Sequence, residues 1–377
     1  MIYFVVPAGR DSLFREYLEL WGRNLSERMS IVHYETLVRQ TRCPRGTYVL
    51  STLDELNPAM RGVLEDLHRQ LDGRDGVRIL NHPFRTLRRY DLLAELQRRN
   101  LNEFRAVRAG EDLTRLRYPV FLRGERDHEG AISPLLHSAA AVEAGIGRAL
   151  VQGHRLRNLM VVEFCATADA GGFYRKYAAF VVGNRVVARS LNYGSEWMLK
   201  FGRNEYSRSM VLEERDYVLS NPHEAQLAEI FRVGGVEYGR VDYSLKDGRV
   251  QTWEINLNPT IGRGARRQRA KVPADLDSIR QETKVCFYSR FQEAWEAADT
   301  APDGQPAIPV TLDPRTIRAA LSREVQRGRL LATLRTVLRP IKPLIEPRAA
   351  PALRFLSRLA RGRLPRPEAP ESHHLFE

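Results

Sequence analysis

The sequence contains few cysteines and no long apolar run. Its three cysteines are scattered and lack the spacing of a metal site: Cys43, Cys165 and Cys286. A sparse, odd set of thiols argues against a disulfide-stapled secreted scaffold and indicates reduced thiols in a cytoplasmic protein. No apolar run is long enough to span a bilayer. The opening MIYFVVPAG has no basic lead-in and too short an apolar stretch for a secretory signal, so we expect a buried first strand.

Two further patterns are missing from the sequence. It shows no internal repeat, and it shows no Ser/His/Asp or Cys/His arrangement of a covalent nucleophile. The hydrophobic content of 43% is that of an ordinary globular protein, and 377 residues suffice for two or three domains. These features favour an enzyme that works without a covalent intermediate on its own side chains.

Negative charge is scarce at the C-terminal end. The formal net charge is +13, and residues 313–377 carry 14 Lys and Arg against 6 Asp and Glu, a balance of +8. The preceding residues are therefore only mildly basic, as suits an enzyme that handles anionic nucleotides and substrates.

Residues 235–260 carry the most informative pattern, GVEYGRVDYSLKDGRVQTWEINLNPT. Asp242 precedes a turn, and Glu254 and Asn256 follow it on one face of the next strand. We predict a three-residue loop, 246–248, which would pair Asp242 with Thr252 on that same face. Such oxygen donors suit Mg²⁺, which takes one or two carboxylates and completes its shell with phosphate and water. The alternative is a solvated hairpin whose polar face happens to be acidic.

This segment resembles the ATP-grasp superfamily, whose last strands carry an acid followed by Glu-x-Asn as magnesium ligands. The resemblance implies that Asp242, Glu254 and Asn256 bind the metal. Gly239-Arg240-x-Asp242 is similar to the D-alanine–D-alanine ligase branch, where the Arg steadies the transferring phosphoryl group. Arg240 would have that role here, or it would simply neutralise the carboxylates beside it.

Further motifs match the family in their linear order, over roughly residues 77–262. Two basic positions stand where the family usually has lysines that reach the nucleotide phosphates. The first is Arg89, with Arg88 as the alternative, and the second is Arg123 at the end of the strand YPVFLR. The loop 124–131 corresponds to the family's glycine-rich flap. The replacement of both lysines by arginine is a departure from the family pattern.

The motifs that follow concern the nucleotide. Glu163 and Phe164 end the strand LMVVEF, which is similar to the hinge that meets adenine, and Asp169 stands where a carboxylate often meets the ribose. Lys176, in the pair Lys-Tyr, resembles the phosphate-contacting lysine of the D-alanine–D-alanine ligases. Arg189 closes the next strand, where it would face the substrate or lie at a solvated strand end.

The resemblance implies an α/β fold in several parts. We expect a preATP-grasp domain over residues 1–85 and a small ATP-grasp subdomain over 86–162. A second subdomain, 163–300, would carry the metal site. Within the first part, strands at 2–7, 48–51 and 77–80 alternate with helices at 12–26 and 58–71, which favours a parallel sheet.

Residues 301–377 form a linker and a basic, partly helical tail. Leu and Ile are mixed with Arg at helical spacing over 316–338 and 353–364. Such a tail binds an anionic membrane or an acidic partner, or it packs its apolar face on the body. Phe355 is the one aromatic residue in these helical stretches, so we rank nucleic acid below membrane or protein.

We therefore predict an ATP- and Mg²⁺-dependent ligase, with Mn²⁺ as the alternative metal, that joins a small anionic carboxylate to an amine or thiol. An ATP-grasp kinase is the first alternative, and a non-catalytic nucleotide-binding protein acting through its tail is the second. The predicted location is cytoplasmic, with the tail as a possible peripheral membrane contact. The oligomeric state is left open.

Overall fold

The computed structural model describes the chain except for residues 127–129, 200–206, 263–273, 301–303 and 323–377. The chain divides into two compact units. The first comprises Met1–Ala106 and Cys165–Glu324, and the second, among the described residues, comprises Val107–Phe164. The elements are a mixture of helices, a parallel sheet and antiparallel sheets, which is the α/β class that the sequence predicts.

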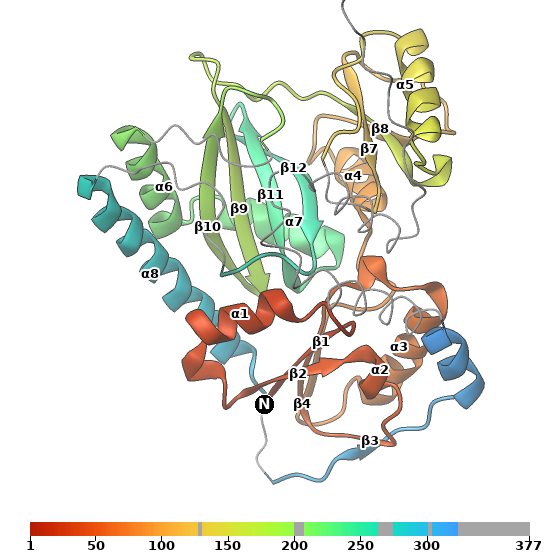
Figure 1. Ribbon diagram of the computed structural model, residues 1–377. Helices are drawn as coiled ribbons and strands as arrows, with labels where there is room; N and C mark the ends of the chain where they lie inside the picture. The colour runs from red at the N-terminus through yellow and green to blue at the C-terminus, as the bar shows by residue number, and fades with distance from the viewer. Residues whose placement is uncertain (127–129, 200–206, 263–273, 301–303, 323–377) are drawn as a thin grey trace, which may run out of the picture. The chain divides into compact units, whose positions relative to one another are not determined.

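A parallel four-stranded sheet opens the first unit, in the order β2-β1-β4-β5 (Figure 1). The strands are β1 (Ile2–Val6), β2 (Met29–His33), β4 (Gly46–Leu50) and β5 (Val77–Leu80). The connecting elements are α1 (Ser12–Leu20), η1 (Arg23–Leu25), α2 (Tyr34–Leu37), β3 (Arg42–Cys43), η2 (Leu53–Glu55) and α3 (Pro58–Leu71). β4 is buried along its whole length, as expected for an interior parallel strand. The predicted alternation of strands and helices is confirmed.

The bounds of α3 match the prediction because its first turn carries clear signals. Asn57 caps the helix by accepting a hydrogen bond from the Met60 N–H at 2.9 Å, and Pro58 occupies the first turn. The predicted helix 12–26 is shorter, since α1 ends at Leu20 and a 3₁₀ turn follows. The sequence does not predict β2, an edge strand that is mostly half-exposed and has no regular apolar alternation.

An antiparallel sheet forms the centre of the first unit, in the order β10-β9-β11-β12. The strands are β9 (Tyr174–Val182), β10 (Arg185–Gly194), β11 (Tyr238–Lys246) and β12 (Arg249–Asn256). The register places Ser190 opposite Ala178, Ala178 opposite Asp242, and Asp242 opposite Glu254, so these four residues form one row across the sheet.

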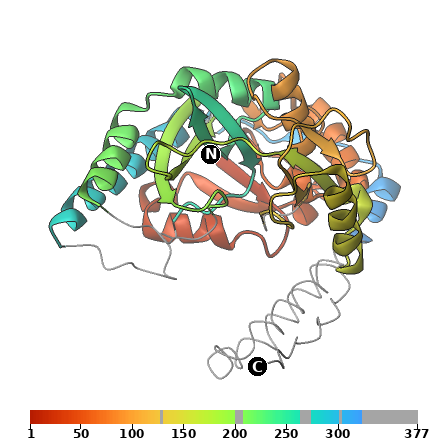
Figure 2. The same cartoon turned by 90° about the horizontal axis from the view of Figure 1, so that it is seen from above.

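Helices α6 (Arg208–Ser220), α7 (Glu224–Gly234) and α8 (Ala274–Ala298) pack against this sheet. Tyr217 of α6 contacts the stacked rings of Tyr177 and Tyr243, while Phe291 of α8 contacts Phe180. α6 and α8 lie side by side next to β10, as both views show (Figures 1 and 2). The sheet therefore has aromatic contacts with α6 through one set of strand positions and with α8 through the other.

Asn81 joins the parallel and antiparallel sheets. It follows β5 and has a left-handed backbone, with φ of 69°, and it is fully buried. Its Nδ2 donates to the carbonyls of Leu50 (3.1 Å) and Tyr238 (2.8 Å). Its Oδ1 accepts from the N–H groups of Glu237 (2.8 Å) and Tyr238 (3.0 Å). A single side chain therefore fixes the start of β11 to the ends of β4 and β5.

The chain then approaches its own backbone closely at Gly235. This residue has φ of 61°, and a Cβ atom there would lie 2.5 Å from the carbonyl oxygen of Arg85. Thr86 Oγ1 donates to the Gly235 carbonyl at 2.9 Å, and the Leu87 N–H donates to the Gly234 carbonyl at 2.8 Å. Only glycine meets both demands, the positive φ and the close contact. The segment leading into helix α4 (Arg89–Arg98) is held in this way.

The second unit is a small sheet, in the order β6-β8-β7, with one helix. Its elements are β6 (Ala106–Arg108), β7 (Val120–Gly124), η3 (Leu156–Asn158), β8 (Leu159–Glu163) and α5 (Ala139–Val151). Ser138 caps α5 by accepting from the Ala141 N–H at 3.2 Å. Its core is aliphatic and consists of Leu116, Val120, Leu122, Leu136, Val142, Ala149, Leu159 and Val161.

The last described residues return to the first unit. β13 (Ile308–Pro309) pairs with β3, and residues 314–322 are helical. Ala320 and Leu321 are buried, and Asn57 Nδ2 donates to the Ala320 carbonyl at 3.1 Å. The start of the predicted helix 316–338 is therefore packed on the body, and its remainder lies outside the described residues.

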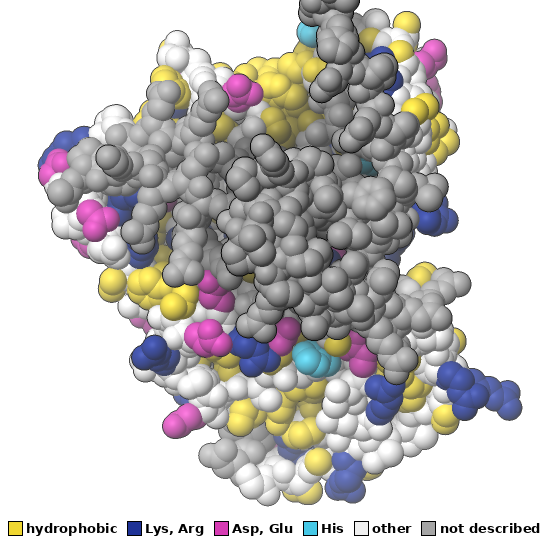
Figure 3. Space-filling model, in the orientation of Figure 1, with side chains coloured by type: hydrophobic (Ala, Val, Ile, Leu, Met, Phe, Trp, Pro, Cys, Tyr) yellow, Lys and Arg dark blue, Asp and Glu magenta, His cyan; other side chains and the backbone are white. Residues whose placement is uncertain are grey.

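Lys and Arg side chains are interspersed with Asp and Glu over the N-terminal part of the first unit (Figure 3). Within the described part of the chain, no helix combines the length and apolar character needed to cross a membrane.

Candidate active site

The β11–β12 hairpin closes with a two-residue turn, so the predicted three-residue loop is wrong. Lys246 pairs directly with Arg249, leaving Asp247 and Gly248 as the turn. Both have positive φ, 51° and 74°, as a type I′ turn requires. Asp-Gly is a favoured dipeptide for that turn, whose twist matches that of the flanking strands. The sequence therefore contained the turn signal, and the prediction counted one residue too many.

The shorter turn by itself would place Asp242 and Glu254 on opposite faces of the hairpin. A β-bulge at Trp253 brings them back to the same face. Tyr243 pairs with Thr252, but Asp242 pairs with Glu254, so Trp253 is the extra residue. The predicted pairing of Asp242 with Thr252 is therefore wrong. Asp242 still lies on the face of Glu254, because the bulge shifts β12 by one residue. The Trp253 indole N–H donates to Ser244 Oγ at 3.0 Å, which anchors the bulge to β11.

Asp242 is buried between two basic side chains. Arg240 binds it through two hydrogen bonds, Nε to Oδ1 at 2.8 Å and Nη2 to Oδ2 at 3.2 Å. Lys176 Nζ, on β9, lies 3.6 Å from Asp242 Oδ2. Burial acts to lower the pKa of Arg240, but the charge of Asp242 and the hydrogen bonds to it prevail and raise the pKa. The structure thus brings together three of the residues that the sequence singles out.

Glu254 has its own basic partner, Arg89, at the start of α4. The Arg89 guanidinium forms an ion pair with Glu254 Oε2, and the two side chains are only 6% and 14% exposed. Arg88, the alternative considered from the sequence, is the N-cap residue of α4. Of Arg88 and Arg89, Arg89 is therefore the residue that forms an ion pair with Glu254 of β12.

The segment after Asn256 is fixed by hydrogen bonds from distant parts of the first unit. Asn256 Oδ1 accepts from the Asn258 N–H at 2.9 Å, and Asn258 Nδ2 donates to the Arg10 carbonyl at 3.1 Å. Ser51 Oγ, at the end of β4, donates to the Leu257 carbonyl at 2.8 Å. Sequence reasoning missed Ser51 and Asn258, because no local pattern reveals a partner some 200 residues away. The run Asn-Leu-Asn-Pro at 256–259 was the sequence signal that could have pointed to this segment.

The next carbonyls of this segment also have side-chain donors. Arg240 Nη1 lies 3.4 Å from the Thr260 carbonyl, and Tyr288 Oη donates to the Ile261 carbonyl at 3.1 Å. Arg189 Nη2 lies 3.4 Å from the same Ile261 carbonyl. Asn256 is therefore followed by a backbone segment that both sheets and α8 hold in place.

Asp169 stabilises the loop before β9. Its Oδ1 accepts from the N–H groups of Gly171 (2.9 Å) and Phe173 (3.0 Å), and its Oδ2 binds the Arg175 guanidinium. The hydrogen bond from Arg175 and that from the Phe173 N–H lower the pKa of the Asp169 carboxyl group. A contact with ribose stays a prediction, and such a contact would have to share these oxygens.

Three predicted nucleotide contacts lie in the second unit. Arg123 is buried on β7, and Glu163 is the buried last residue of β8. The Glu163 carboxylate accepts from the Arg117 N–H at 2.8 Å and from Arg117 Nη2 at 2.9 Å. Phe164 N donates to the Pro119 carbonyl at 2.9 Å. The role of each of these residues with a nucleotide stays a prediction.

The acidic residues of the first unit fit magnesium. Among the residues that the structure describes, no three His, Cys, Asp or Glu side chains gather as a metal-binding group. The predicted donors are instead two adjacent carboxylates, Asp242 and Glu254, with the amide of Asn256 on the same face. Mg²⁺ is commonly held by one or two carboxylates plus phosphate oxygens, so this donor set suits it. The basic cluster Arg263, Arg266, Arg267 and Arg269 and part of the loop 124–131 lie outside the described residues.

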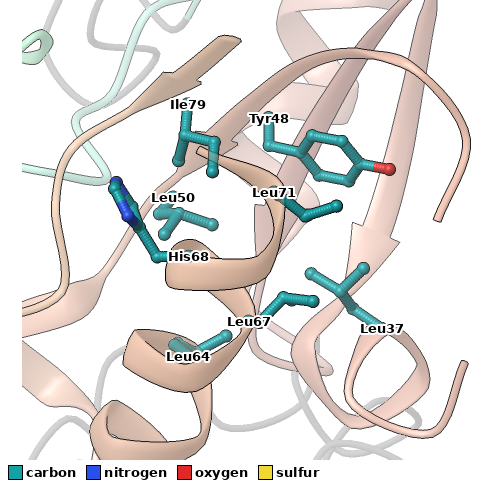
Figure 4. Close-up of a pocket in the computed structure, with 8 residues that line it drawn as sticks. All are labelled: Leu37, Tyr48, Leu50, Leu64, Leu67, His68, Leu71 and Ile79. Atoms are coloured by element: carbon teal, nitrogen blue, oxygen red, sulfur yellow. The ribbon is translucent and has the colours of Figure 1, made fainter. Parts of the chain in front are cut away.

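A pocket in the N-terminal part of the first unit has a different character. It is lined by Leu37, Tyr48, Leu50, Leu64, Leu67, His68, Leu71 and Ile79 (Figure 4). The lining comes from α2, α3, β4 and β5 and is almost entirely apolar. Since His68 is the one side chain of this lining that can carry a positive charge and no carboxylate lines it, we interpret it as a packing gap between helix and sheet.

No family model matches this sequence, and no curated protein matches it. Solved structures with a similar fold include D-alanine–D-alanine ligase from Bacillus anthracis, with 12% identity over 78% of this chain and 98% of that chain, at a TM-score of 0.43. A RimK domain ATP-grasp protein from Sphaerobacter thermophilus matches with 15% identity over 76% and 98%, at 0.42. L-amino acid ligase from Bacillus licheniformis matches with 13% identity over 68% and 66%, at 0.37. The function proposed below therefore rests on the site residues of this chain.

Proposed function

We propose that this chain is an ATP- and Mg²⁺-dependent ligase of the ATP-grasp type, which activates a carboxylate for attack by an amine or thiol. The observation that carries the proposal is the pairing of Asp242 with Glu254 across β11 and β12, with Asn256 on the same face. Each carboxylate has a basic partner, Arg240 with Lys176 for the first and Arg89 for the second.

This arrangement of charges suits phosphoryl transfer. Asp242, Glu254 and Asn256 would hold the magnesium ion, which supplies charge neutralisation for the triphosphate. The guanidinium of Arg240 and the ammonium of Lys176, which contact Asp242, would stabilise the phosphoryl oxygens as the group moves. Arg123, Glu163, Phe164 and Asp169 are the proposed nucleotide contacts, and Arg89 is a proposed phosphate contact.

The proposed reaction has two steps. An oxygen of the substrate carboxylate attacks the γ-phosphorus of ATP, the bond to the bridging oxygen breaks, and ADP leaves. The amine nitrogen or thiol sulfur then attacks the acyl carbon, loses its proton, and inorganic phosphate leaves. The protein provides orientation and charge for both steps, and no covalent bond to its own side chains is needed.

Hydroxylamine tests the proposal directly, because it replaces the natural amine and yields a hydroxamate, which forms a coloured complex with added ferric iron. Wild-type protein with ATP, Mg²⁺ and a panel of carboxylic acids should release ADP and form hydroxamate with the accepted acids. Glu254→Gln and Asp242→Asn should lose both products. Glu229→Gln, an exposed ion-paired glutamate on α7, is the matched control and should keep them.

The same assay separates the alternatives. ADP release with a stable phosphorylated product and no hydroxamate would favour a kinase. Nucleotide binding without ADP release on any acid would favour a non-catalytic protein. Wild-type turnover retained by Glu254→Gln across a magnesium titration would overturn the metal assignment.

A further inference from the structure

Arg189 is a positively charged side chain on β10, and no ion pair joins it to a carboxylate of the described residues. We propose that Arg189 binds a second anionic group on the carboxylate substrate and so selects dianionic acids. This inference rests on the proposed ligase function and adds to it the chemical class of the substrate.

A β-bulge sets the direction of Arg189. On β10, Ala188 pairs with Ala179 and Ser190 pairs with Ala178, so Arg189 is the extra residue between them. Ser190 lies in the row that continues through Ala178 to Asp242 and Glu254. The two bulges of this sheet, at Arg189 and at Trp253, therefore lie next to the same row of residues.

Aromatic rings and a carbonyl hold the Arg189 guanidinium. Its Cζ lies 4.4 Å from the ring centre of Phe287 and 5.5 Å from that of Tyr288, both on α8. Its Nη2 lies 3.4 Å from the Ile261 carbonyl, in the segment that follows Asn256. These contacts orient the guanidinium without neutralising its charge, and a guanidinium has several N–H donors in a fixed fork that matches a carboxylate.

The charge balance around Arg189 differs from that at the other basic residues of the site. Arg240 and Lys176 are paired with Asp242, and Arg89 is paired with Glu254. Among the described residues, no carboxylate lies within ion-pair distance of Arg189.

The acidic group with the clearest electrostatic effect here is Glu214 of α6. Burial raises the pKa of Glu214, against the lowering effects of the Leu191 N–H and of the positive charges of Arg189, Arg280 and Lys284. Glu214 and Arg189 thus interact through their charges, although no ion pair joins these two described side chains.

The spacing of the strands also predicts how far apart the two anionic groups of the substrate lie. Ser190 on β10 and Asp242 on β11 are separated by β9, so their backbones lie about 10 Å apart, at about 4.8 Å for each strand spacing. The residue between them is Ala178, which has a small side chain. An acid whose two anionic groups lie several bonds apart fits this span better than one with both groups on neighbouring atoms.

The test compares matched acids in the hydroxamate assay. Butyrate carries one carboxylate, and succinate, glutarate and adipate carry two at increasing separation. In the wild type, KM for the preferred dicarboxylate should be at least about tenfold below that for butyrate, since charged hydrogen bonds have that worth. Arg189→Met, which removes the charge but keeps an unbranched side chain, should abolish this difference and leave KM for ATP unchanged. Arg189→Lys should restore part of it.

Arg185→Met is the matched control, because Arg185 is an exposed arginine at the start of the same strand. It should leave the selectivity intact. A wild type without preference for dicarboxylates, or an Arg189→Met variant that retains the preference, would overturn the inference. A purely structural role would lower the melting temperature of Arg189→Met without changing the ratio of the KM values.

A binding measurement separates this inference from the proposed function. Glutarate is titrated calorimetrically into wild type and Arg189→Met without ATP. Salt-sensitive binding that Arg189→Met loses supports the anion site even if no acid yields hydroxamate, in which case the ligase function alone fails. Equal binding by the two proteins, or none by the wild type, rejects the anion site whatever the activity assay shows.

Discussion

Arg89 and Glu254 form an ion pair that joins the start of α4 to strand β12. Both side chains are largely buried, and they come from positions 165 residues apart. The pair therefore has a desolvation cost, because each charge has left most of its water.

A double-mutant cycle compares the cost of losing Arg89 in the presence and in the absence of the Glu254 charge. Arg89→Met alone leaves a nearly buried carboxylate without its partner, so we expect the free energy of unfolding to fall by about 2 kcal/mol. In a Glu254→Gln background the same change should cost at least about 1 kcal/mol less, since no charge is left behind. Urea denaturation of the four proteins gives both values. An equal cost in the two backgrounds would show that the pair is not coupled.

Asn81 should contribute to stability through its side chain. Asn81→Gly keeps the left-handed backbone but removes four hydrogen bonds to the Leu50 carbonyl and the start of β11. Because the freed groups stay buried, we expect a loss of about 3 kcal/mol in the free energy of unfolding. Asn100→Gly is the control, since Asn100 is exposed and also has positive φ. Similar losses in the two variants would refute the role given to the Asn81 amide.

Alanine substitutions at two glycines would separate the effect of a close contact on stability from the effect of backbone conformation. Gly73 and Gly235 have φ of 69° and 61°, but a Cβ at Gly73 would meet nothing within 4 Å. Gly73→Ala should therefore cost about 1 kcal/mol, the price of a left-handed L residue. Gly235→Ala should cost clearly more, because its Cβ would lie 2.5 Å from the Arg85 carbonyl. Chemical denaturation compares them, and equal costs would contradict the close approach.

The buried carboxyl group of Glu237 should make stability depend on pH. Burial raises its pKa above the ordinary 4.5, against the Asn81 N–H and the charges of Arg78, His68 and Arg85. The folded protein thus holds this proton more tightly than the unfolded chain. The stabilisation is complete below pH 4.5 and is lost as the pH rises through the raised pKa. The stability of the wild type relative to Glu237→Gln should therefore fall as the pH rises above 4.5. A difference that stays constant or rises over this range would show that the pKa is not raised.

The basic tail can be removed without touching the packed helix. A chain ending after Ser322 keeps Ala320 and Leu321, which are buried, and the hydrogen bond from Asn57 to the Ala320 carbonyl. We expect it to retain its melting temperature and any activity on small substrates. If the tail docks on anionic surfaces, the parent should sediment with phosphatidylserine-containing vesicles at low salt and the shortened chain should not. A parent that never sediments with such vesicles would reject the docking role.

The sequence predicts the elements with strong local signals. Asn57-Pro58 marks the start of α3, and the Asp-Gly turn marks the hairpin, although the loop length was misjudged by one residue. The bulge at Trp253 left no signal that would distinguish it from a regular strand. The shared face of Asp242 and Glu254 was therefore predicted through an incorrect pairing.

Long-range partners were beyond sequence reasoning for a different reason. The contacts of Asn81 with β11 and of Ser51 with Leu257 depend on which strands become neighbours, and neither residue stands in a distinctive pattern. Arg89 was a candidate because of its place in the linear order of motifs. Its contact with Glu254 came from the fold.

Engineering of this chain by recombination has a natural constraint in the segment after β12. The Leu257 carbonyl and the Asn258 side chain bond to Ser51 and to the Arg10 carbonyl, which belong to the opening sheet. A chimera that exchanges the N-terminal sheet alone would join residues that have not been selected together. Crossovers that carry positions 10, 51 and 257–258 from one parent should yield folded, active hybrids more often than crossovers that separate them.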